Sequence, residues 1–284
     1  MAKLTFIIKN TDLFIHAAAE SHVDRSIHSV SKFIETNVQG TGCILDAMIH
    51  SKNLGRQVDL IHISTDEVYG SLGPLDDPFT EKTPLDPKNP YAASKASSDL
   101  LVLSYVNTHS ISACITRCSN NYGPNQFPEK LIPLMTLNCL NGRKLPIYGD
   151  GLQIRDWINV KDHVDGIISI VEMMSQGTIN SGEIINFGAN NEMTNIEIVK
   201  KIIEISDAEG SEIEFVRDRP GHDRRYAMGY EKAKNILGWE PKVDWESGIL
   251  ETVRWYKENN DWIESINTNQ YREWIFTQYG SEKE

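Results

Sequence analysis

The stretch from Ser64 to Lys95 constrains the fold more than any other part of the chain. It follows a short apolar run, Val58–Ile63, whose β-branched residues are typical of a buried parallel strand. Thr65, Asp66 and Glu67 come directly after this run. They would lie at the carboxyl end of the strand, where open α/β sheets bind their ligands. The stretch therefore predicts a ligand site at one edge of a parallel sheet.

The same stretch closes with the start of a predicted helix. Asn89 can cap this helix, and Pro90 suits its first position. Tyr91 and Lys95 are four residues apart and share one helical face. A phenol has an ordinary pKa of about 10, and an ammonium group beside it favours the phenolate, so the pair predicts a base near neutral pH. A Tyr-x-x-x-Lys pair also arises by chance and does not establish catalysis alone.

Two further segments predict strands of the same sheet. Asp12–Ala19 reads as a buried strand that ends in small residues, which would let a ligand approach the backbone. Ile111–Arg117 reads as the next strand and ends in the polar segment Cys118–Pro124. With helical patterns between them, these strands predict an α/β fold with a doubly wound parallel sheet.

Composition and charge limit the classes of function. The 284 residues can form one large domain or two smaller ones, and 40% apolar with 24% charged residues is typical of a globular chain. A net charge of −12 without a basic stripe argues against nucleic-acid binding. No apolar run is long enough for a membrane span, and we expect a cytoplasmic protein without a signal peptide. The four cysteines form no Cys-x-x-Cys pair, so we expect neither disulfides nor a metal site.

Ser-Thr-Asp-Glu-Val-Tyr-Gly at 64–70, followed by Tyr-x-x-x-Lys at 91–95, resembles the hallmark of the extended short-chain dehydrogenase/reductase family. Within that family it is most similar to the dTDP-glucose 4,6-dehydratases, and the resemblance covers nearly the whole chain. It implies a Rossmann-like NAD-binding domain over 1–123 and about 152–176. It also implies a smaller α/β domain for the sugar nucleotide, over about 124–151 and 177–284.

The chain lacks the beginning that this family normally has. Family members start with a strand and a Gly-x-x-Gly-x-x-Gly turn that holds the cofactor pyrophosphate at a helix N-terminus. Neither Gly40-Thr41-Gly42, inside a helical pattern, nor Gly149 with Gly151 matches that turn. About 60 residues would be missing, and Leu4–Lys9 would be the end of a helix before the Asp12 strand. We expect the exposed sheet edge to impair folding and NAD to bind weakly.

The resemblance implies a redox-neutral dehydration of dTDP-glucose to a 4-keto-6-deoxy sugar with bound NAD. Tyr91, supported by Lys95, would remove the C4 hydroxyl proton while C4 gives a hydride to NAD. Glu67 would take the C5 proton and Asp66 would protonate the departing C6 hydroxyl, after which the hydride returns to C6. Thr65 would hydrogen-bond the C4 oxygen. Adjacent carboxyl groups suit this task because their repulsion keeps one proton between them.

The resemblance also assigns binding residues. We expect cofactor contacts from Ala17, Ala18, Ala19, Ser21, Thr36, Tyr91, Lys95 and Asn121. We expect substrate contacts from Ser21, Thr65, Asn120, Lys130, Leu131, Pro146, Ile147, Tyr148, Arg155, Asn191, Asp218, Arg219 and His222.

Arginines are the expected phosphate ligands, since a guanidinium group binds phosphate oxygens bidentately. Arg155 could bind phosphate or form a local surface salt bridge with Asp156. The four arginines of the segment 217–225 resemble a diphosphate clamp, although a solvated loop is the alternative. Further along, Thr194 and Glu197 predict a capping box. The tail from Tyr230 onward predicts two or three amphipathic helices in which Trp239, Trp245, Trp255, Trp262 and Trp274 serve packing.

Related family members supply the alternative functions. Epimerases typically have a serine in place of Thr65 and no Asp-Glu pair, and decarboxylases usually have a serine where Asp66 stands. The pair Asp66-Glu67 therefore favours a dehydratase, while a UDP-glucose dehydratase and an inactive truncated homologue stay open. The family usually forms a homodimer through helices near Ser31–Ile49 and Tyr91–Val106. The apolar faces of these helices could equally cover the sheet.

Overall fold

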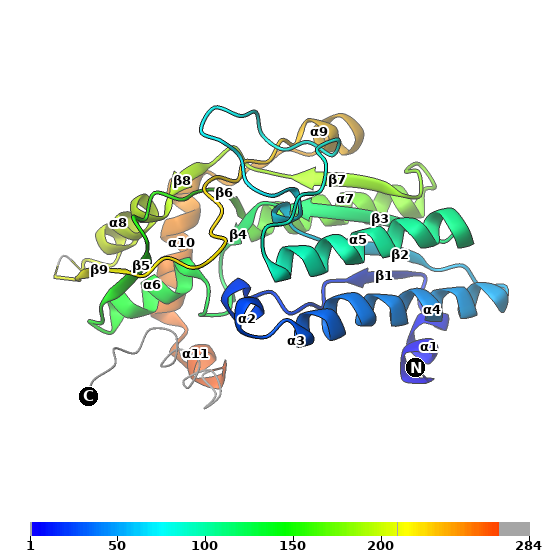
Figure 1. Ribbon diagram of the computed structural model, residues 1–284, viewed down its shortest axis with the longest axis horizontal. Helices are drawn as coiled ribbons and strands as arrows, with labels where there is room; N and C mark the ends of the chain where they lie inside the picture. The colour runs from blue at the N-terminus through cyan, green and yellow to red at the C-terminus, as the bar shows by residue number, and fades with distance from the viewer. Residues whose placement is uncertain (1, 209, 267–284) are drawn as a thin grey trace.

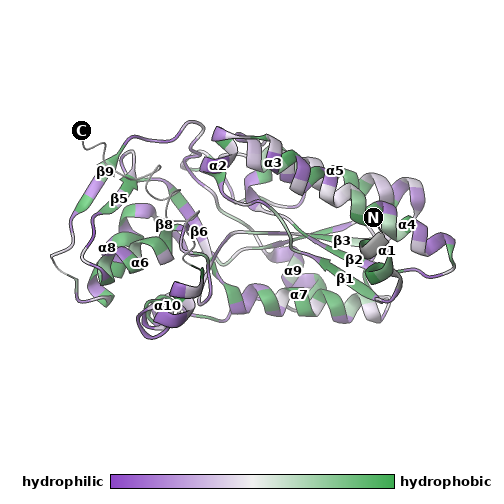
Figure 2. Cartoon of the chain, turned by 90° about the horizontal axis from the view of Figure 1, so that it is seen from below, coloured by the Kyte–Doolittle hydropathy of each residue, from purple (hydrophilic) through white to green (hydrophobic). Residues whose placement is uncertain are grey.

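The computed structural model describes residues 2–208 and 210–266. Its larger part is an open sheet of four parallel strands in the order β1-β2-β3-β7, with helices on both faces (Figure 1, Figure 2). This confirms the predicted Rossmann-like α/β fold. The strands are β1 Leu13–His16, β2 Asp59–Ile63, β3 Ser112–Cys118 and β7 Glu183–Phe187.

Alternating side chains of the strands build two cores, one on each face of the sheet. Leu60, Ala113 and Ile115 belong to one core, together with α4 and α5. Ile61 and Cys114, which point the other way, pack with α7 and α9. The helices of this part are α1 Ala2–Lys9, α2 Val23–His28, α3 Ser31–Phe33, the π-helix η1 Ile34–Gln39, α4 Gly40–Asn53, the 3₁₀ turn η2 Asp66–Tyr69, α5 Pro90–His109, α7 Val160–Ser175 and α9 Glu231–Leu237.

The first strand differs from the prediction. The predicted strand is confirmed as β1, but it comprises only Leu13–His16, and the burial predicted over Asp12–Ala19 is wrong because the side chain of Ile15 is 45% exposed. The reason is its position: β1 pairs with β2 on one side, and no other described strand pairs with it. The expected exposed edge of the sheet is confirmed among the described strands. The helix predicted to precede the strand is confirmed as α1, whose Ile8 is buried in the core beside α4.

The smaller part of the molecule has a core of its own. It is formed by α6, α8 and α10 against two short sheets of order β4-β6-β8 and β5-β9. Its strands are β4 Asn120–Tyr122, β5 Leu145–Tyr148, β6 Ile154–Asn159, β8 Glu192–Thr194 and β9 Ile213–Val216. Its helices are α6 Leu131–Leu140, α8 Asn195–Ile205, α10 Trp245–Glu258 and α11 Asn260–Ile266.

The sequence patterns that predicted helices in this part agree with the structure. The capping box of Thr194 and Glu197 begins α8. Helices α9 to α11 confirm the predicted helical tail as far as residue 266, whereas Trp274 lies outside the described residues. None of the described helices is long and apolar enough to cross a membrane.

The chain crosses between the two parts more often than the predicted domain boundaries allow. β7 pairs with β3 and completes the large sheet, so placing all of 177–284 in the substrate domain is wrong for 183–187. Helix α9 follows β7, since Ala233 shares a core with Phe187. β6 lies in the predicted NAD-binding segment 152–176 but pairs with β4 and β8 of the small sheet. Hydrogen bonding and core packing, rather than chain order, divide the two parts.

The exposed edge of β1 yields a prediction about solubility. Replacing Ile15 by lysine should reduce aggregation on warming while leaving the melting temperature nearly unchanged, because a charge on an edge strand opposes edge-to-edge pairing and the side chain is already exposed. Light scattering during a thermal ramp measures the effect. The matched control is Ile61→Lys, which buries a charge in the core and should prevent folding. Equal aggregation of Ile15→Lys and the parent would contradict the role of this edge.

Candidate active site

A cavity of about 370 Å³ lies where the large sheet meets the smaller part. It is lined from the carboxyl ends of β2 and β3 on one side and from β5, β6 and α6 on the other. Most of the predicted site residues line it, namely Ser21, Thr65, Asp66, Glu67, Tyr91, Asn120, Asn121, Lys130, Leu131, Pro146, Ile147, Tyr148, Arg155, Arg219 and His222. The remaining predicted residues, Ala17, Ala18, Ala19, Thr36, Lys95, Asn191 and Asp218, do not.

Thr65, Asp66 and Glu67 follow β2 directly and turn into η2. The Thr65 hydroxyl caps this turn by accepting a hydrogen bond from the Glu67 backbone N–H at 3.3 Å, and it donates to Asp66 Oδ1 at 3.2 Å. Asp66 is only 2% exposed, and its Oδ2 has no hydrogen-bond partner among the described residues. Burial, followed by the neighbouring charge of Glu67, raises the pKa of Asp66 well above its ordinary value. Asp66 therefore carries a proton near neutral pH, as a general acid must.

Helix α5 begins at the predicted cap. Asn89 Oδ1 accepts a hydrogen bond from the Ala92 backbone N–H at 2.9 Å, and Pro90 takes the first helical position. Tyr91 and Lys95 are both buried one helical turn apart. This start of α5 lies beside η2, which brings Tyr91 and Glu67 into the same cavity.

The electrostatics of Tyr91 differ from the prediction. Burial raises the pKa of Tyr91 well above 10, and the charge of Glu67 adds to the effect. The Lys95 ammonium group donates a hydrogen bond to the Ile63 carbonyl at 2.7 Å, and burial lowers the pKa of Lys95. The predicted lowering of the Tyr91 pKa by Lys95 is therefore wrong for this structure, because burial of the phenol outweighs the nearby ammonium group.

A buried polar network supports Lys95 from behind. His16 of β1 and His62 of β2 share a hydrogen bond of 3.0 Å between their Nδ1 atoms. Asp99 of α5 accepts from Arg117 Nε at 2.9 Å, and its other oxygen lies 3.5 Å from His62 Nε2. Burial lowers the pKa of His16 to about 3, so its ring is neutral at physiological pH. Sequence analysis missed this network, because His16, His62 and Arg117 occupy strand positions that read as apolar core and Asp99 lies inside a helix.

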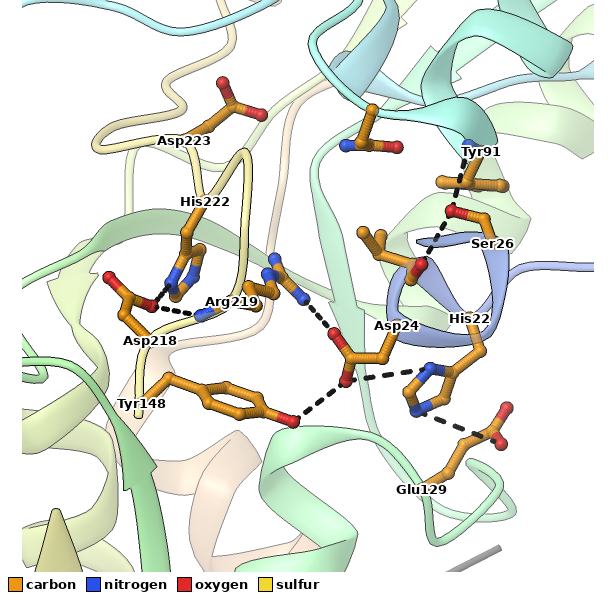
Figure 3. A network of polar contacts seen from close by, with 12 residues as sticks. His22, Asp24, Ser26, Tyr91, Glu129, Tyr148, Asp218, Arg219, His222 and Asp223 are labelled. Atoms are coloured by element: carbon orange, nitrogen blue, oxygen red, sulfur yellow. Dashed lines mark hydrogen bonds and ion pairs between the residues drawn. The ribbon is translucent and has the colours of Figure 1, made fainter. Parts of the chain in front are cut away.

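At the other end of the cavity, Asp24 of α2 joins the two parts of the molecule (Figure 3). Its Oδ2 accepts a hydrogen bond from the Tyr148 hydroxyl at 3.0 Å, and its Oδ1 lies 3.4 Å from Arg219 Nη1. His22 lies 3.8 Å from the same carboxylate, and burial lowers the pKa of His22 to about 2. Sequence analysis did not single out His22 or Asp24, since only the fold brings Asp24 against Tyr148 and Arg219, which are 124 and 195 positions away.

Arg155, the first of the expected phosphate ligands, is buried at the cavity. Arg155 is 5% exposed, stacks on Tyr226 at 4.3 Å and donates to the carbonyls of Ile154 and Asp223. The alternative of a salt bridge to Asp156 is wrong, because the Asp156 oxygens accept from the backbone N–H groups of Ala189 and Asn191. Arg155 therefore faces the cavity with no ion pair among the described residues.

The cluster 217–225 does not act as one clamp. Arg224 pairs with Asp150 at 2.9 Å, and Arg225 pairs with Glu192 at 2.6 Å, both away from the cavity. Only Arg219 and His222 of this segment line the cavity. The Arg219 Nε atom is buried and has no hydrogen-bond partner among the described residues. The prediction of a four-arginine clamp is wrong because two of its members are neutralised by carboxylates elsewhere.

Comparison with known proteins places this chain in a known family. The family described as GDP-mannose 4,6 dehydratase matches residues 2–252. The dTDP-glucose 4,6-dehydratase of Neisseria meningitidis serogroup B is 47% identical over 92% of this chain and 77% of that protein. The dTDP-glucose 4,6-dehydratase 1 of Escherichia coli K12 is 44% identical over 98% of this chain and 81% of that protein.

A solved structure agrees with these relatives. The dTDP-glucose 4,6-dehydratase DesIV from Streptomyces venezuelae, solved with NAD and dTDP bound, superimposes with a TM-score of 0.87 at 43% identity. The match covers 94% of this chain and 79% of that one. Family match, identity and structure agree, and the chain belongs to the dTDP-glucose 4,6-dehydratase family.

Proposed function

We propose that this protein dehydrates dTDP-glucose to dTDP-4-keto-6-deoxyglucose with NAD as its cofactor. One observation carries the proposal: a buried Asp66, whose pKa is raised by that burial, lies beside Glu67 and lines the cavity that Tyr91 also lines. Removal of water needs one acid and one base at neighbouring carbon atoms, and this pair supplies both. The 44–47% identity to dTDP-glucose 4,6-dehydratases supports the choice of substrate.

In the first stage, Tyr91 Oη takes the proton of the C4 hydroxyl. Burial raises the pKa of this phenol, so its phenolate, once formed, is the stronger base for the C4 hydroxyl proton. Thr65 lines the cavity between Tyr91 and Asp66 and would orient the C4 oxygen. When bound, NAD accepts two electrons from C4 and returns them to C6 within the same turnover.

In the second stage, Glu67 takes the proton from C5, which the C4 ketone has made acidic. Asp66 gives its proton to the C6 oxygen, the C6–O bond breaks, and water leaves as a C5–C6 double bond forms. Glu67 then returns a proton to C5. The raised pKa of Asp66 suits the acid, whereas the half-buried Glu67 carboxylate suits the base.

The described residues fit the reactive half of a nicotinamide dinucleotide. Lys95 is held behind Tyr91 by the Ile63 carbonyl, and Asn121 lines the cavity at the end of β3. Ala17, Ala18 and Ala19 form an exposed loop of small side chains after β1, at the edge where such sheets bind nucleotides. We propose that these residues hold the nicotinamide and its ribose.

We further propose that the protein forms a homodimer in the cytoplasm. The inner faces of α4 and α5 cover the sheet through Leu45, Met48 and Val102. Two apolar side chains on the outer side, Leu100 of α5 and Ile34 of η1, are 56% and 40% exposed, which supports an interface there. All four cysteines are free, which suits a reducing compartment.

The proposed catalytic roles predict that a Tyr91 variant fails at a different step from variants of Glu67 and Asp66. In 1–284 with saturating NAD, Tyr91→Phe should abolish oxidation. Glu67→Gln and Asp66→Asn should still oxidise C4 but should slow product formation by about 10²–10⁴-fold, because each lacks one proton-transfer group. Rapid-mixing absorbance of reduced cofactor separates the two steps, and mass spectrometry identifies the product. A product that keeps its C6 hydroxyl would indicate an epimerase and would contradict the proposal.

The geometry of Arg219 predicts its contribution to nucleotide binding. Arg219→Lys keeps the charge but loses the guanidinium fork, so dTDP should bind roughly 10- to 100-fold more weakly, as expected for one charge-assisted hydrogen bond. Arg224→Lys is the matched control from the same loop, since Arg224 pairs with Asp150 outside the cavity. Calorimetry measures both variants, and the same titration with UDP tests the choice of base. Equal affinities of the two variants would rule out Arg219 as a diphosphate ligand.

The proposed interface predicts a change of mass. Leu100→Asp should convert a dimer into a monomer at micromolar concentration, because it places a charge on the exposed apolar side of α5. Light scattering coupled to gel filtration measures the mass. Leu75→Asp is the control, since Leu75 is 98% exposed and lies on the loop between η2 and α5. A parent protein that is already monomeric would contradict the dimer.

A further inference from the structure

Asn89 makes two hydrogen bonds that serve different parts of the site. Its Oδ1 accepts from the Ala92 backbone N–H at 2.9 Å and so caps α5. Its Nδ2 donates to Glu67 Oε2 at 3.1 Å. The side chain is 6% exposed, so neither bond competes freely with water. One planar amide therefore links the start of the helix that carries Tyr91 to the carboxylate that follows β2.

No other described residue donates a hydrogen bond to the Glu67 carboxylate through its side chain. Glu67 and Asn89 are 22 positions apart in the sequence, so only the tertiary fold sets the distance between η2 and α5. The start of α5 is also held by α2, because the Tyr91 backbone N–H donates a hydrogen bond to Ser26 Oγ at 3.2 Å (Figure 3). The amide of Asn89 thus attaches Glu67 to an anchored helix end.

The bond also distinguishes the two oxygens of Glu67. Oε2 is occupied by the amide, which leaves Oε1 to accept a proton. A free carboxylate on a turn rotates about its side-chain bonds, whereas one held by a single oxygen keeps a fixed direction at a small cost in entropy. Holding Glu67 in this way fixes it at the cavity that Tyr91, two residues beyond Asn89, also lines.

We propose that Asn89 is a positioning residue for the elimination step, in which it holds Glu67 Oε2 so that Oε1 removes the C5 proton. This inference rests on the proposed function of Glu67. In the step itself, the C5–H bond breaks and its proton passes to Oε1. The C5–C6 double bond forms, and the C6 oxygen leaves as water with the proton of Asp66. Asn89 takes no part in the oxidation that precedes it.

The test distinguishes the role of Asn89 as the cap of α5 from its hydrogen bond to Glu67. Serine caps helices about as well as asparagine, but its side chain is too short to span the distance to Glu67. Asn89→Ser should therefore keep the melting temperature within about 2 °C of the parent, whereas Asn89→Ala, which removes the cap as well, should lower it. Asn159→Ser is the matched control, because Asn159 caps α7 through Lys161 outside the cavity.

Rapid mixing of NAD-loaded protein with dTDP-glucose gives the decisive measurement. In Asn89→Ser, oxidation should proceed within about 2-fold of the parent. Elimination and the exchange of the C5 hydrogen with D₂O should slow by roughly 10- to 100-fold, so that reduced cofactor accumulates. Asn159→Ser should show no accumulation.

Two results would overturn the inference. If oxidation and elimination slow together, or if the melting temperature falls as in Asn89→Ala, Asn89 serves the helix alone. If Glu67→Gln blocks elimination while the Asn89 variants turn over like the parent, the role of Glu67 stands and only the inference on Asn89 fails. Normal turnover by Glu67→Gln would instead refute the proposed function itself.

Discussion

The pairing of β2 with β3 is the interaction on which the rest of the structure depends. Its parallel register ends where the Ser64 N–H donates to the Thr116 carbonyl at 2.6 Å. Because parallel strands end at the same edge, this register sets the acidic segment after β2 beside the segment 118–121 after β3. The latter continues into β4, which leaves the large sheet for the small one. The cavity therefore lies where the chain changes sheets, as is general for open α/β folds.

Burial gives this site its chemistry. The pKa of Asp66 is raised because the carboxyl group is removed from water beside a second carboxylate. Lys95 and the ion pair of Asp99 with Arg117 are buried as well. Removing one partner of such a buried pair typically costs about 3–5 kcal/mol. This ion pair ties α5 to β3, while Asn89 caps the start of α5.

The sequence predicted those features that depend on neighbours along the chain. The strands β2 and β3, the Asn89 cap and the Thr194 capping box all follow from patterns of a few residues. The predictions that needed packing were wrong: the burial of β1, the effect of Lys95 on Tyr91, the arginine clamp and the domain boundaries. Each depended on which distant group lies opposite a side chain, and one chain without its fold does not contain that information.

The sequence by itself determined the class of fold, the family and the chemical groups of the site, because these reside in a contiguous motif at 64–70 and its partner at 91–95. Tertiary structure decided the protonation of Asp66, the separation of Arg219 from Arg224, and the contact of Asp24 with Tyr148 across 124 residues. The physical reason is that charge states and ion pairs depend on burial and on distances of a few ångström. Only the packing of α2, β5 and the 217–222 loop around one cavity sets those distances.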